Sequence, residues 1–177
     1  MSLPPSLEPI PAMVLARLDA LEAEGAIRRV MAEYLRLCDR LDADTPMDVL
    51  GELFTEDAVW AGQGARYGVT YGSHDGRAAI VAMLAKYRGP PPHFALNAHF
   101  LASEAMSVDG AGATGSWVML QTSTFADGAS RLSAARLDVD FRAEASRWRI
   151  ARFLTTNLFS RPVSGWDDPT PVPTPKP

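Results

Sequence analysis

The residues whose types most clearly suggest chemistry lie in the stretch PPPHFALNAH, residues 90–99. Three prolines precede a strand-like segment, in which strict alternation places His93, Asn97 and His99 on one face and large apolar side chains on the other. An unpaired buried polar group costs roughly 1 to 3 kcal/mol, so an inward-facing polar set predicts a polar-lined pocket. Alternatively, this face meets solvent, or the histidines hydrogen-bond only to the surrounding structure.

An arginine stands out in the last predicted strand. Alternation places Arg152 on the same face as three apolar side chains, Trp148, Ile150 and Leu154. A guanidinium among apolar side chains needs an anionic partner or an opening to a pocket. One interpretation is therefore a pocket residue, and the other is a salt bridge at the end of the sheet with Asp138 or Asp140.

A helical pattern extends from Ala12 to Leu41, with Gly25 as a possible break into two helices. Tyr34 lies near the middle of its apolar stripe, where a phenol is commonly a core residue with a locally bonded hydroxyl. Asp39 lies at the edge of the stripe. Asp42 would be more central if the helix continues that far, so periodicity alone favours Asp42 as the inward carboxylate.

The remaining pattern places helices first and long strands last. A short helix follows Pro46, the segments 58–62 and 65–73 are interpreted as short strands or a hairpin, and a helix is expected from Gly76 to about Tyr87. Turn-rich separators divide the three long strand candidates, which are 111–126, 130–143 and 147–159. This order predicts an α+β fold with helices across one face of a curved antiparallel sheet.

The chain divides into three parts by composition. We expect a flexible arm at residues 1–11, a single α+β domain at 12–160 and a proline-rich tail at 161–177. A domain of this size buries roughly two thirds of its unfolded surface, enough for one sizeable core.

Composition excludes several classes. The chain has 17 basic and 21 acidic residues among 177 and a pI near 5.3, so no basic excess predicts binding to nucleic acid or a membrane surface. Cys38 is the single cysteine and cannot form an intrachain disulfide. The sequence shows neither a leader pattern nor an apolar run of about 18 residues, which predicts a cytoplasmic protein. Small neutral or anionic molecules are the expected partners.

Motifs for bound groups are not found. The sequence has no cysteine pair, no H-E-x-x-H, no acidic calcium loop and no phosphate-binding glycine loop after a strand. It also lacks the G-x-S-x-G of serine hydrolases. We therefore expect no metal site and no cofactor.

The order and spacing of five segments resemble the SnoaL-like family of the nuclear transport factor-like superfamily. The segments are AIRRVMAEYLRLCDRLD, LFTEDAVW, YGSHDGRAAI, HFALN and RWRIAR. The nearest likeness is to scytalone dehydratase, bile-acid dehydratase and hexachlorocyclohexane dehydrochlorinase, over roughly residues 20–160. This resemblance implies a cone-shaped, cystatin-like fold, in which a strongly curved antiparallel sheet wraps around the N-terminal helices and leaves a deep apolar pocket. It also implies a homodimer or homotrimer.

The resemblance also implies a catalytic pair. The family pattern Y-x-x-x-x-D falls on Tyr34 and Asp39, which favours Asp39 over Asp42, and the pattern H-x-x-x-N falls on His93 and Asn97. Dehydratases of the family carry a further His or Asp on the next strand. At the corresponding place this chain offers only Ser116, Trp117 or Met119, and this departure argues against the bile-acid and scytalone substrates.

These residues fit acid–base chemistry. A neutral His93 would take a proton from carbon, while Asp39 fixes the tautomer of the imidazole and stabilises the imidazolium. Tyr34 would donate to a carbonyl or leaving oxygen, and Arg152 would stabilise developing negative charge. The other residues expected to line the pocket are Asn97, His99, Trp60, Tyr67, Trp117 and Met119.

The predicted function is a cofactor-independent lyase that carries out a β-elimination, of dehydratase or dehydrohalogenase type, on a small hydrophobic cyclic compound. The first alternative is an isomerase like ketosteroid isomerase, or a polyketide cyclase, using the same pocket. The second is a non-catalytic binding or assembly subunit, such as the small subunit of a dioxygenase, because one fold serves many functions. That second alternative predicts no contact between His93 and Asp39 and a large exposed apolar sheet face.

Overall fold

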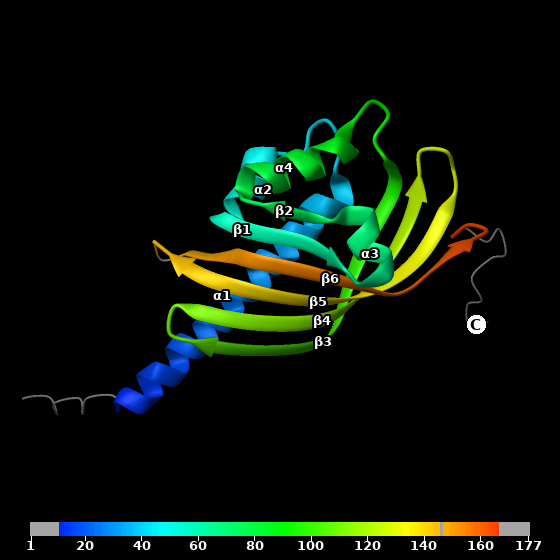
Figure 1. The fold of residues 1–177 in the computed structure, drawn as a ribbon. Coiled ribbons are helices and arrows are strands. Elements are labelled where there is room, and N and C mark those ends of the chain that lie inside the picture. Colours follow the sequence, from blue (N-terminus) through cyan, green and yellow to red (C-terminus); the bar gives the residue numbers. More distant parts are fainter. Residues whose placement is uncertain (1–10, 146, 167–177) are drawn as a thin grey trace, which may run out of the picture.

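A computed structural model describes residues 11–145 and 147–166 of the chain. Most of the predicted N-terminal arm and the end of the proline-rich tail lie outside the described residues. Helices come first in the chain and long strands last, as Figure 1 shows. The elements, in order, are α1 (Ala12–Arg40), α2 (Met47–Glu52), β1 (Phe54–Gln63), α3 (Gly64–Tyr71), β2 (Ser73–Asp75), α4 (Arg77–Ala85), the 3₁₀ helix η1 (Lys86–Arg88), β3 (Phe94–Asp109), β4 (Gly112–Phe125), β5 (Ser130–Glu144) and β6 (Arg147–Val163).

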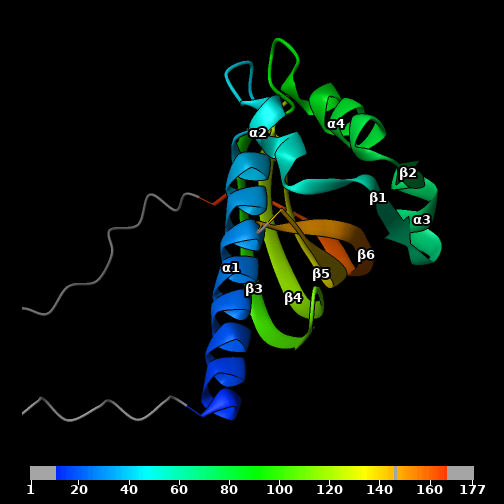
Figure 2. The ribbon, with the colours of Figure 1, turned by 90° about the vertical axis from the view of Figure 1, so that its left-hand side faces the viewer.

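The strands form one curved, unclosed sheet of six strands in the order β2-β1-β6-β5-β4-β3. Strands β3 to β6 are antiparallel neighbours joined by short turns, whereas β1 runs parallel to β6. The sheet is therefore mixed. The predicted α+β fold with a strongly curved sheet is confirmed, and Figure 2 shows α1 lying along the sheet on its inner side.

Helix α1 packs onto the sheet through one face of its C-terminal half. Ile27, Met31, Tyr34 and Cys38 recur at three- and four-residue spacing and are buried, as expected for an amphipathic helix on an apolar layer. The helix is continuous through Gly25, so the predicted break does not occur. It ends at Arg40, two residues after the buried Cys38 and beside strand β3.

The segment 64–75 differs from the sequence expectation. Its aromatic and β-branched residues suggested strands, but it forms helix α3 followed by the short strand β2. Helix α3 folds back tightly onto β1: a Cβ at Gly62 would lie 2.2 Å from the carbonyl oxygen of Tyr67. Glycine at this position therefore permits the approach that brings Tyr67 and Tyr71, one helical turn apart, over the inner face of the sheet.

Strands β3 and β6 each contain two β-bulges relative to their neighbours, and one bulge in each strand changes which of the predicted side chains face inward. Strand β3 has an extra residue between Phe94 and Leu96 relative to β4, and β6 has one between Ile150 and Arg152 relative to β5. A bulge inserts one residue and reverses the alternation beyond it. The faces predicted by strict alternation are therefore wrong across each of these two bulges: His93 does not share the face of Asn97 and His99, and Arg152 does not share the face of Ile150.

Candidate active site

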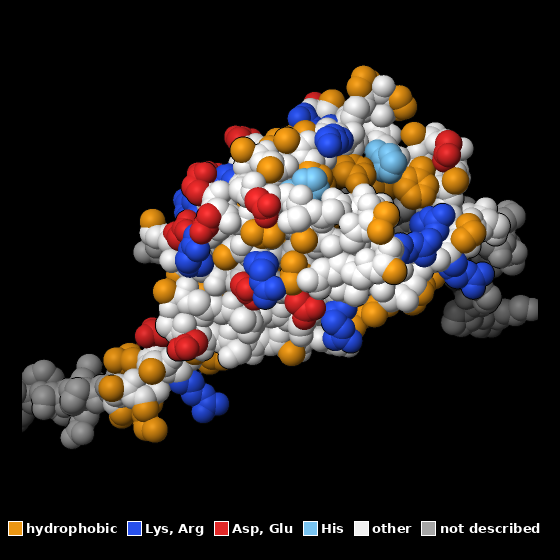
Figure 3. Space-filling view, in the orientation of Figure 1, with side chains coloured by type: hydrophobic (Ala, Val, Ile, Leu, Met, Phe, Trp, Pro, Cys, Tyr) orange, Lys and Arg blue, Asp and Glu red, His pale blue; other side chains and the backbone are white. Residues whose placement is uncertain are grey.

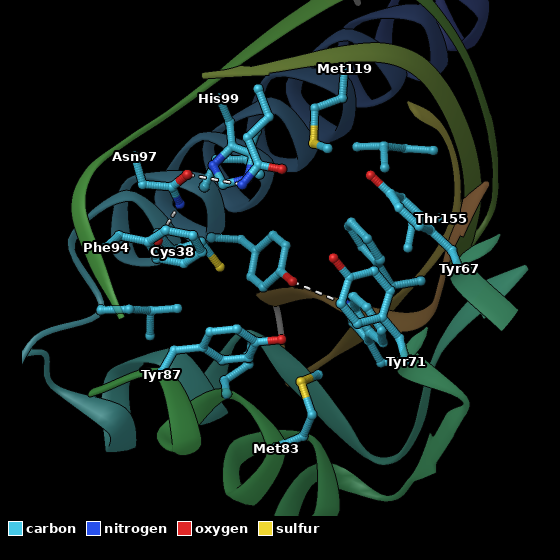
Figure 4. Close-up of a pocket in the computed structure, with 18 residues that line it drawn as sticks. Cys38, Tyr67, Tyr71, Met83, Tyr87, Phe94, Asn97, His99, Met119 and Thr155 are labelled. Carbon is cyan, nitrogen blue, oxygen red and sulfur yellow. Dashed lines mark hydrogen bonds between the residues drawn. The ribbon is translucent and has the colours of Figure 1, made fainter. Parts of the chain in front are cut away.

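A cavity lies between α1, the inner face of the sheet and the helices α3 and α4. Its volume is about 100 Å³, several times the roughly 10 to 15 Å³ that one water requires. Its wall is mainly apolar and aromatic. The polar groups in it are the four tyrosines of the chain together with Asn97, His99, Gln121 and Thr155. Figure 4 shows many of these side chains around the cavity.

A histidine and an aspartate form the central polar contact of this site. The Nδ1 atom of His99 lies 2.6 Å from Oδ1 of Asp39, and the backbone N–H of His99 donates to the same oxygen at 3.1 Å. The two contacts join the last turn of α1 to β3. The His99 side chain is 9% exposed and lines the cavity, whereas Asp39 is 33% exposed and lies behind it.

This contact sets the protonation pattern of the ring. An ionised carboxylate only accepts hydrogen bonds, so Nδ1 of His99 is the donor and Nε2 keeps its lone pair. The His99 ring forms part of the cavity wall and lies near Asn97 and Met119 in Figure 4. Such an imidazole can accept a proton from a molecule in the cavity, and the carboxylate then stabilises the imidazolium.

Asn97 holds together the elements that carry this pair. Its amide nitrogen donates to the carbonyl oxygen of Cys38 at 3.1 Å, next to Asp39 in α1. Its amide oxygen accepts from Gln121 at 2.9 Å and from Ser123 at 2.8 Å, both on β4. A network in which each amide atom has a partner fixes side-chain orientation, so Asn97 ties α1, β3 and β4 into one frame.

Tyr34 lies buried in the cavity wall with its hydroxyl in a defined position. The indole N–H of Trp60 donates to the Tyr34 oxygen at 3.0 Å, and the Tyr34 ring meets Phe153 edge-on at 5.1 Å between ring centres. Burial raises the pKa of Tyr34 well above its ordinary value, so the phenol keeps its proton and acts as a hydrogen-bond donor. Burial also raises the pKa of the Cys38 thiol to about 12, which excludes it as a nucleophile at neutral pH.

The structure does not bring His93 and Asp39 together. His93 precedes β3, is exposed, and makes edge contacts with the rings of Tyr87 and Phe125. Within the described residues Asp39 bonds to His99 and not to His93. Six residues of extended chain separate the two histidines, about 20 Å, so one carboxylate cannot serve both.

Two other candidates also lie away from the cavity. Arg152 is exposed, and its Nε donates to Asp140 at 2.6 Å, which is the salt-bridge interpretation of the sequence. That hydrogen bond raises the pKa of the guanidinium. Trp117 is buried in the core, where its indole N–H donates to Glu104 at 3.1 Å. The five remaining pocket candidates do line the cavity: Trp60, Tyr67, Asn97, His99 and Met119.

Several wall residues were not identified from the sequence. Tyr71 lies one helical turn after Tyr67, so it would have been found had segment 64–71 been interpreted as a helix. Gln121 lies two residues after Met119, on the same face of β4. Tyr87 and Phe94 enter the wall because the chain turns back between α4 and β3. Gly89 and the prolines at 90–92 indicate a turn there, but not which side chains the turn brings to the wall.

The described residues offer no grouping that could hold a metal, since no three His, Cys, Asp or Glu side chains converge in 11–145 and 147–166. Over the same residues, no helix combines the length and apolar character needed to cross a membrane.

Fold and site together define an α+β protein in which a curved sheet and helices surround a cavity. The cavity wall is mainly apolar and carries a few polar side chains. The family model of the SnoaL-like domain matches residues 19–153, and the chain belongs to this family. No curated protein matches the sequence significantly.

Solved structures with the same fold include enzymes of the elimination type. A hexachlorocyclohexane dehydrochlorinase from Novosphingobium barchaimii aligns with a TM-score of 0.70 and 17% identity, over 88% of this chain and 99% of its own. A scytalone dehydratase-like protein from Novosphingobium aromaticivorans gives 0.67 and 16%, over 82% and 91%. An NTF2-like protein with a cystatin-like fold from the latter organism gives 0.59 and 28%, over 82% and 88%.

Proposed function

We propose that the protein is a cofactor-independent lyase that removes a proton from carbon in a small hydrophobic cyclic compound and expels a neighbouring leaving group. The observation that carries this proposal is the 2.6 Å contact between His99 and Asp39 at the wall of the aromatic cavity. Because Asp39 contacts His99 and not His93, we assign to His99 the role of general base that the sequence predicted for His93. The fold shared with a dehydrochlorinase and a dehydratase-like protein supports the reaction class.

The elimination breaks one C–H bond and the bond from the adjacent carbon to the leaving group. Nε2 of His99 takes the proton, and the electrons of the broken C–H bond form the new C=C bond. The leaving group departs from the adjacent carbon with its bonding pair, as halide or as hydroxide, and hydroxide becomes water by taking the proton held on the imidazolium. Asp39 stabilises the imidazolium through Nδ1. Tyr34 donates a hydrogen bond to the oxygen on which negative charge develops, and the imidazolium then returns its proton to the leaving group or to solvent.

The cavity supports a substrate that is mostly apolar and contains a ring. Tyr34, Tyr67, Tyr71 and Trp60 surround the central space with aromatic faces and edges. Burial raises the pKa of Tyr71 as well as that of Tyr34, so these phenols are hydrogen-bond donors. Apolar burial supplies affinity, and a few phenol and amide groups orient the molecule.

An isomerase or polyketide cyclase is the second candidate. The protonated phenols of Tyr34, Tyr71 and Tyr87 could hold an enolate oxygen while the proton returns to another carbon. The assembly-subunit alternative is supported by the missing contact between His93 and Asp39 and by exposed apolar side chains on the outer face of the sheet. An assembly subunit would have no use for a histidine–aspartate pair in a cavity wall, so we favour an enzyme over an assembly subunit.

A pair of matched substrates separates elimination from isomerisation. β-Hydroxycyclohexanone loses water to give conjugated cyclohexenone, and β,γ-cyclohexenone gives the same product by moving a proton. Both reactions are followed by the ultraviolet absorbance of the conjugated enone. We expect turnover of the hydroxyketone by the wild-type protein, with a loss of about 100- to 10,000-fold in His99→Gln. Turnover of the unsaturated ketone alone would favour the isomerase, and equal rates for wild type and variant would contradict both.

A further inference from the structure

A second compartment, here called the vestibule, opens beside the cavity. It has a volume of about 240 Å³ and shares three wall residues with the cavity, Tyr71, Met83 and Tyr87. These three lie across the cavity from His99 in Figure 4. A molecule whose ring lies near His99 would therefore pass Tyr71 and Tyr87 to reach the vestibule.

The vestibule gathers basic side chains. Its remaining wall includes His74, Lys86 and His93, and no carboxylate is among its lining residues. These are two of the three histidines of the chain and one of its two lysines. Figure 3 shows histidine side chains beside hydrophobic ones in the region bordered by α3 and α4, with a Lys or Arg side chain nearby.

The basic groups are free to bind a ligand. Over residues 11–145 and 147–166, Lys86 makes no ion pair and the His93 ring makes no hydrogen bond. The Nε2 atom of His74 donates to the carbonyl oxygen of Tyr71 at 3.0 Å, which orients this ring in the vestibule wall. By contrast, neither lysine nor arginine lines the cavity in which the ring would lie.

We propose that the vestibule binds a carboxylate of the substrate, so that the substrate class is an amphiphilic cyclic acid. The apolar ring occupies the cavity near His99, and the carboxylate accepts hydrogen bonds from Lys86 and from the ring of His93. This inference rests on the proposed function, because it names the substrate class of the same site. Charge-assisted hydrogen bonds are shorter and stronger than neutral ones.

Phenylbutyrate and its neutral amide test the proposal by calorimetry. The two molecules have the same ring and chain length and differ in charge. We expect the wild-type protein to bind the acid about three- to tenfold more tightly than the amide, a modest factor because Lys86 is exposed. Lys86→Gln keeps the side-chain length and removes the charge, so it should abolish the preference without weakening the amide. His93→Gln should reduce the preference.

Arg17→Gln is the matched control, because it removes one exposed positive charge from the N-terminal part of α1. It should leave the preference for the acid intact. The proposal is overturned by equal affinity of the wild type for acid and amide, by no measurable binding of the acid, or by an equal loss of preference in Arg17→Gln. Preservation of the preference in Lys86→Gln would overturn it as well.

Failure of this inference is distinguishable from failure of the proposed function. His99→Gln should lose turnover of neutral cyclic ketones while it keeps the preference for phenylbutyrate over the amide. If the wild type shows no preference for the acid but turnover still depends on His99, the lyase proposal stands and the proposal of an acidic substrate is rejected. If the preference for the acid depends on Lys86 but turnover does not depend on His99, carboxylate binding in the vestibule stands and the lyase proposal is rejected.

Discussion

Asp39 accepts two hydrogen bonds from one residue, the backbone N–H and the ring Nδ1 of His99. Both bonds fix the position and the tautomer of the imidazole, while Asp39 itself lies outside the cavity wall. Asp39 is therefore a positioning residue in this account, and His99 is the group that meets the substrate. Trp60 positions Tyr34 in a similar way, because its indole N–H donates to the Tyr34 hydroxyl oxygen.

Asp39→Asn should impair catalysis more than binding. The amide keeps the size of the side chain but can donate to Nδ1, which favours the wrong tautomer of His99. We expect kcat to fall by about 100- to 10,000-fold with little change in KM, and the nitrogen chemical shifts of the imidazole to report the changed tautomer. Asp42→Asn is the control, since Asp42 instead bonds to Arg40 and Thr45. Unaltered kcat and nitrogen shifts in Asp39→Asn would remove this role.

The sequence predicted the types of these residues better than their pairing. A helix aspartate, a strand histidine and a tyrosine were expected from the resemblance, and the pocket candidate His99 was assigned from alternation. The partner of Asp39 could not be predicted, because it depends on where the end of α1 crosses β3. That crossing is fixed by tertiary contacts such as the bond from Asn97 to the Cys38 carbonyl, which no local pattern reveals.

At the scale of elements, long strands and the main helix were predictable because their periodicity extends over many residues. The two bulges that interrupt the predicted faces were not predictable. Their extra residues are Ala95 and Ala151, and alanine carries no signal for a bulge. Each bulge reverses the facing of its neighbours: Ile150 and Phe153 are buried, whereas Arg152 is exposed. The same effect places Phe94 in the cavity wall with Asn97 and His99.

An ion pair between separate strands gives a prediction for acid stability. Asp57 on β1 lies 2.5 Å from the Arg142 guanidinium on β5, and Arg142 lowers the pKa of Asp57 from 3.8 to about 2. A carboxyl group with a lowered pKa in the folded state stabilises the protein above its unfolded pKa, and this stabilisation is lost as pH falls through the folded pKa. The wild type should therefore be more stable than Asp57→Asn at pH 5, with the difference disappearing between about pH 4 and pH 2.

Chemical unfolding at several pH values measures this difference. Arg142→Gln provides the control, because Asp57→Asn made in that background should add no further dependence on pH. Both side chains are well exposed, so the effect is small and should weaken with added salt. A difference that grows as the pH falls from 4 to 2 would contradict the assigned pair.

At the scale of the whole molecule, the outer face of the sheet carries an apolar row. Phe100, Leu120, Ala134 and Phe159 are register partners across β3, β4, β5 and β6, and Ala134 is buried between its larger neighbours. Phe100 is 56% exposed, Leu120 38% and Phe159 47%. Contiguous apolar surface of this kind is uncommon on monomers and typically marks an interface. We expect a second copy of the chain to cover this face, as proposed from the sequence for a homodimer or homotrimer.

Light scattering after size-exclusion chromatography tests this expectation. The wild type should have two or three times the 19.1 kDa mass of one chain, and Phe100→Glu combined with Leu120→Glu should shift the mass towards one chain. Val69→Glu, at an 86% exposed position on α3, should leave the mass unchanged. A wild type with the mass of a single chain at micromolar concentration would rule out this interface.

The central claim is that His99, oriented by Asp39, takes a proton from carbon. Deuterium incorporation into the activated methylene of β-tetralone in D₂O, followed by NMR, measures this step without requiring a leaving group. We predict exchange catalysed by the wild type and retained in Arg152→Gln, whose guanidinium lies away from the cavity. His99→Gln should lose at least about 100-fold, far more than His93→Gln. Wild-type exchange rates in His99→Gln, or a loss confined to His93→Gln, would contradict the account.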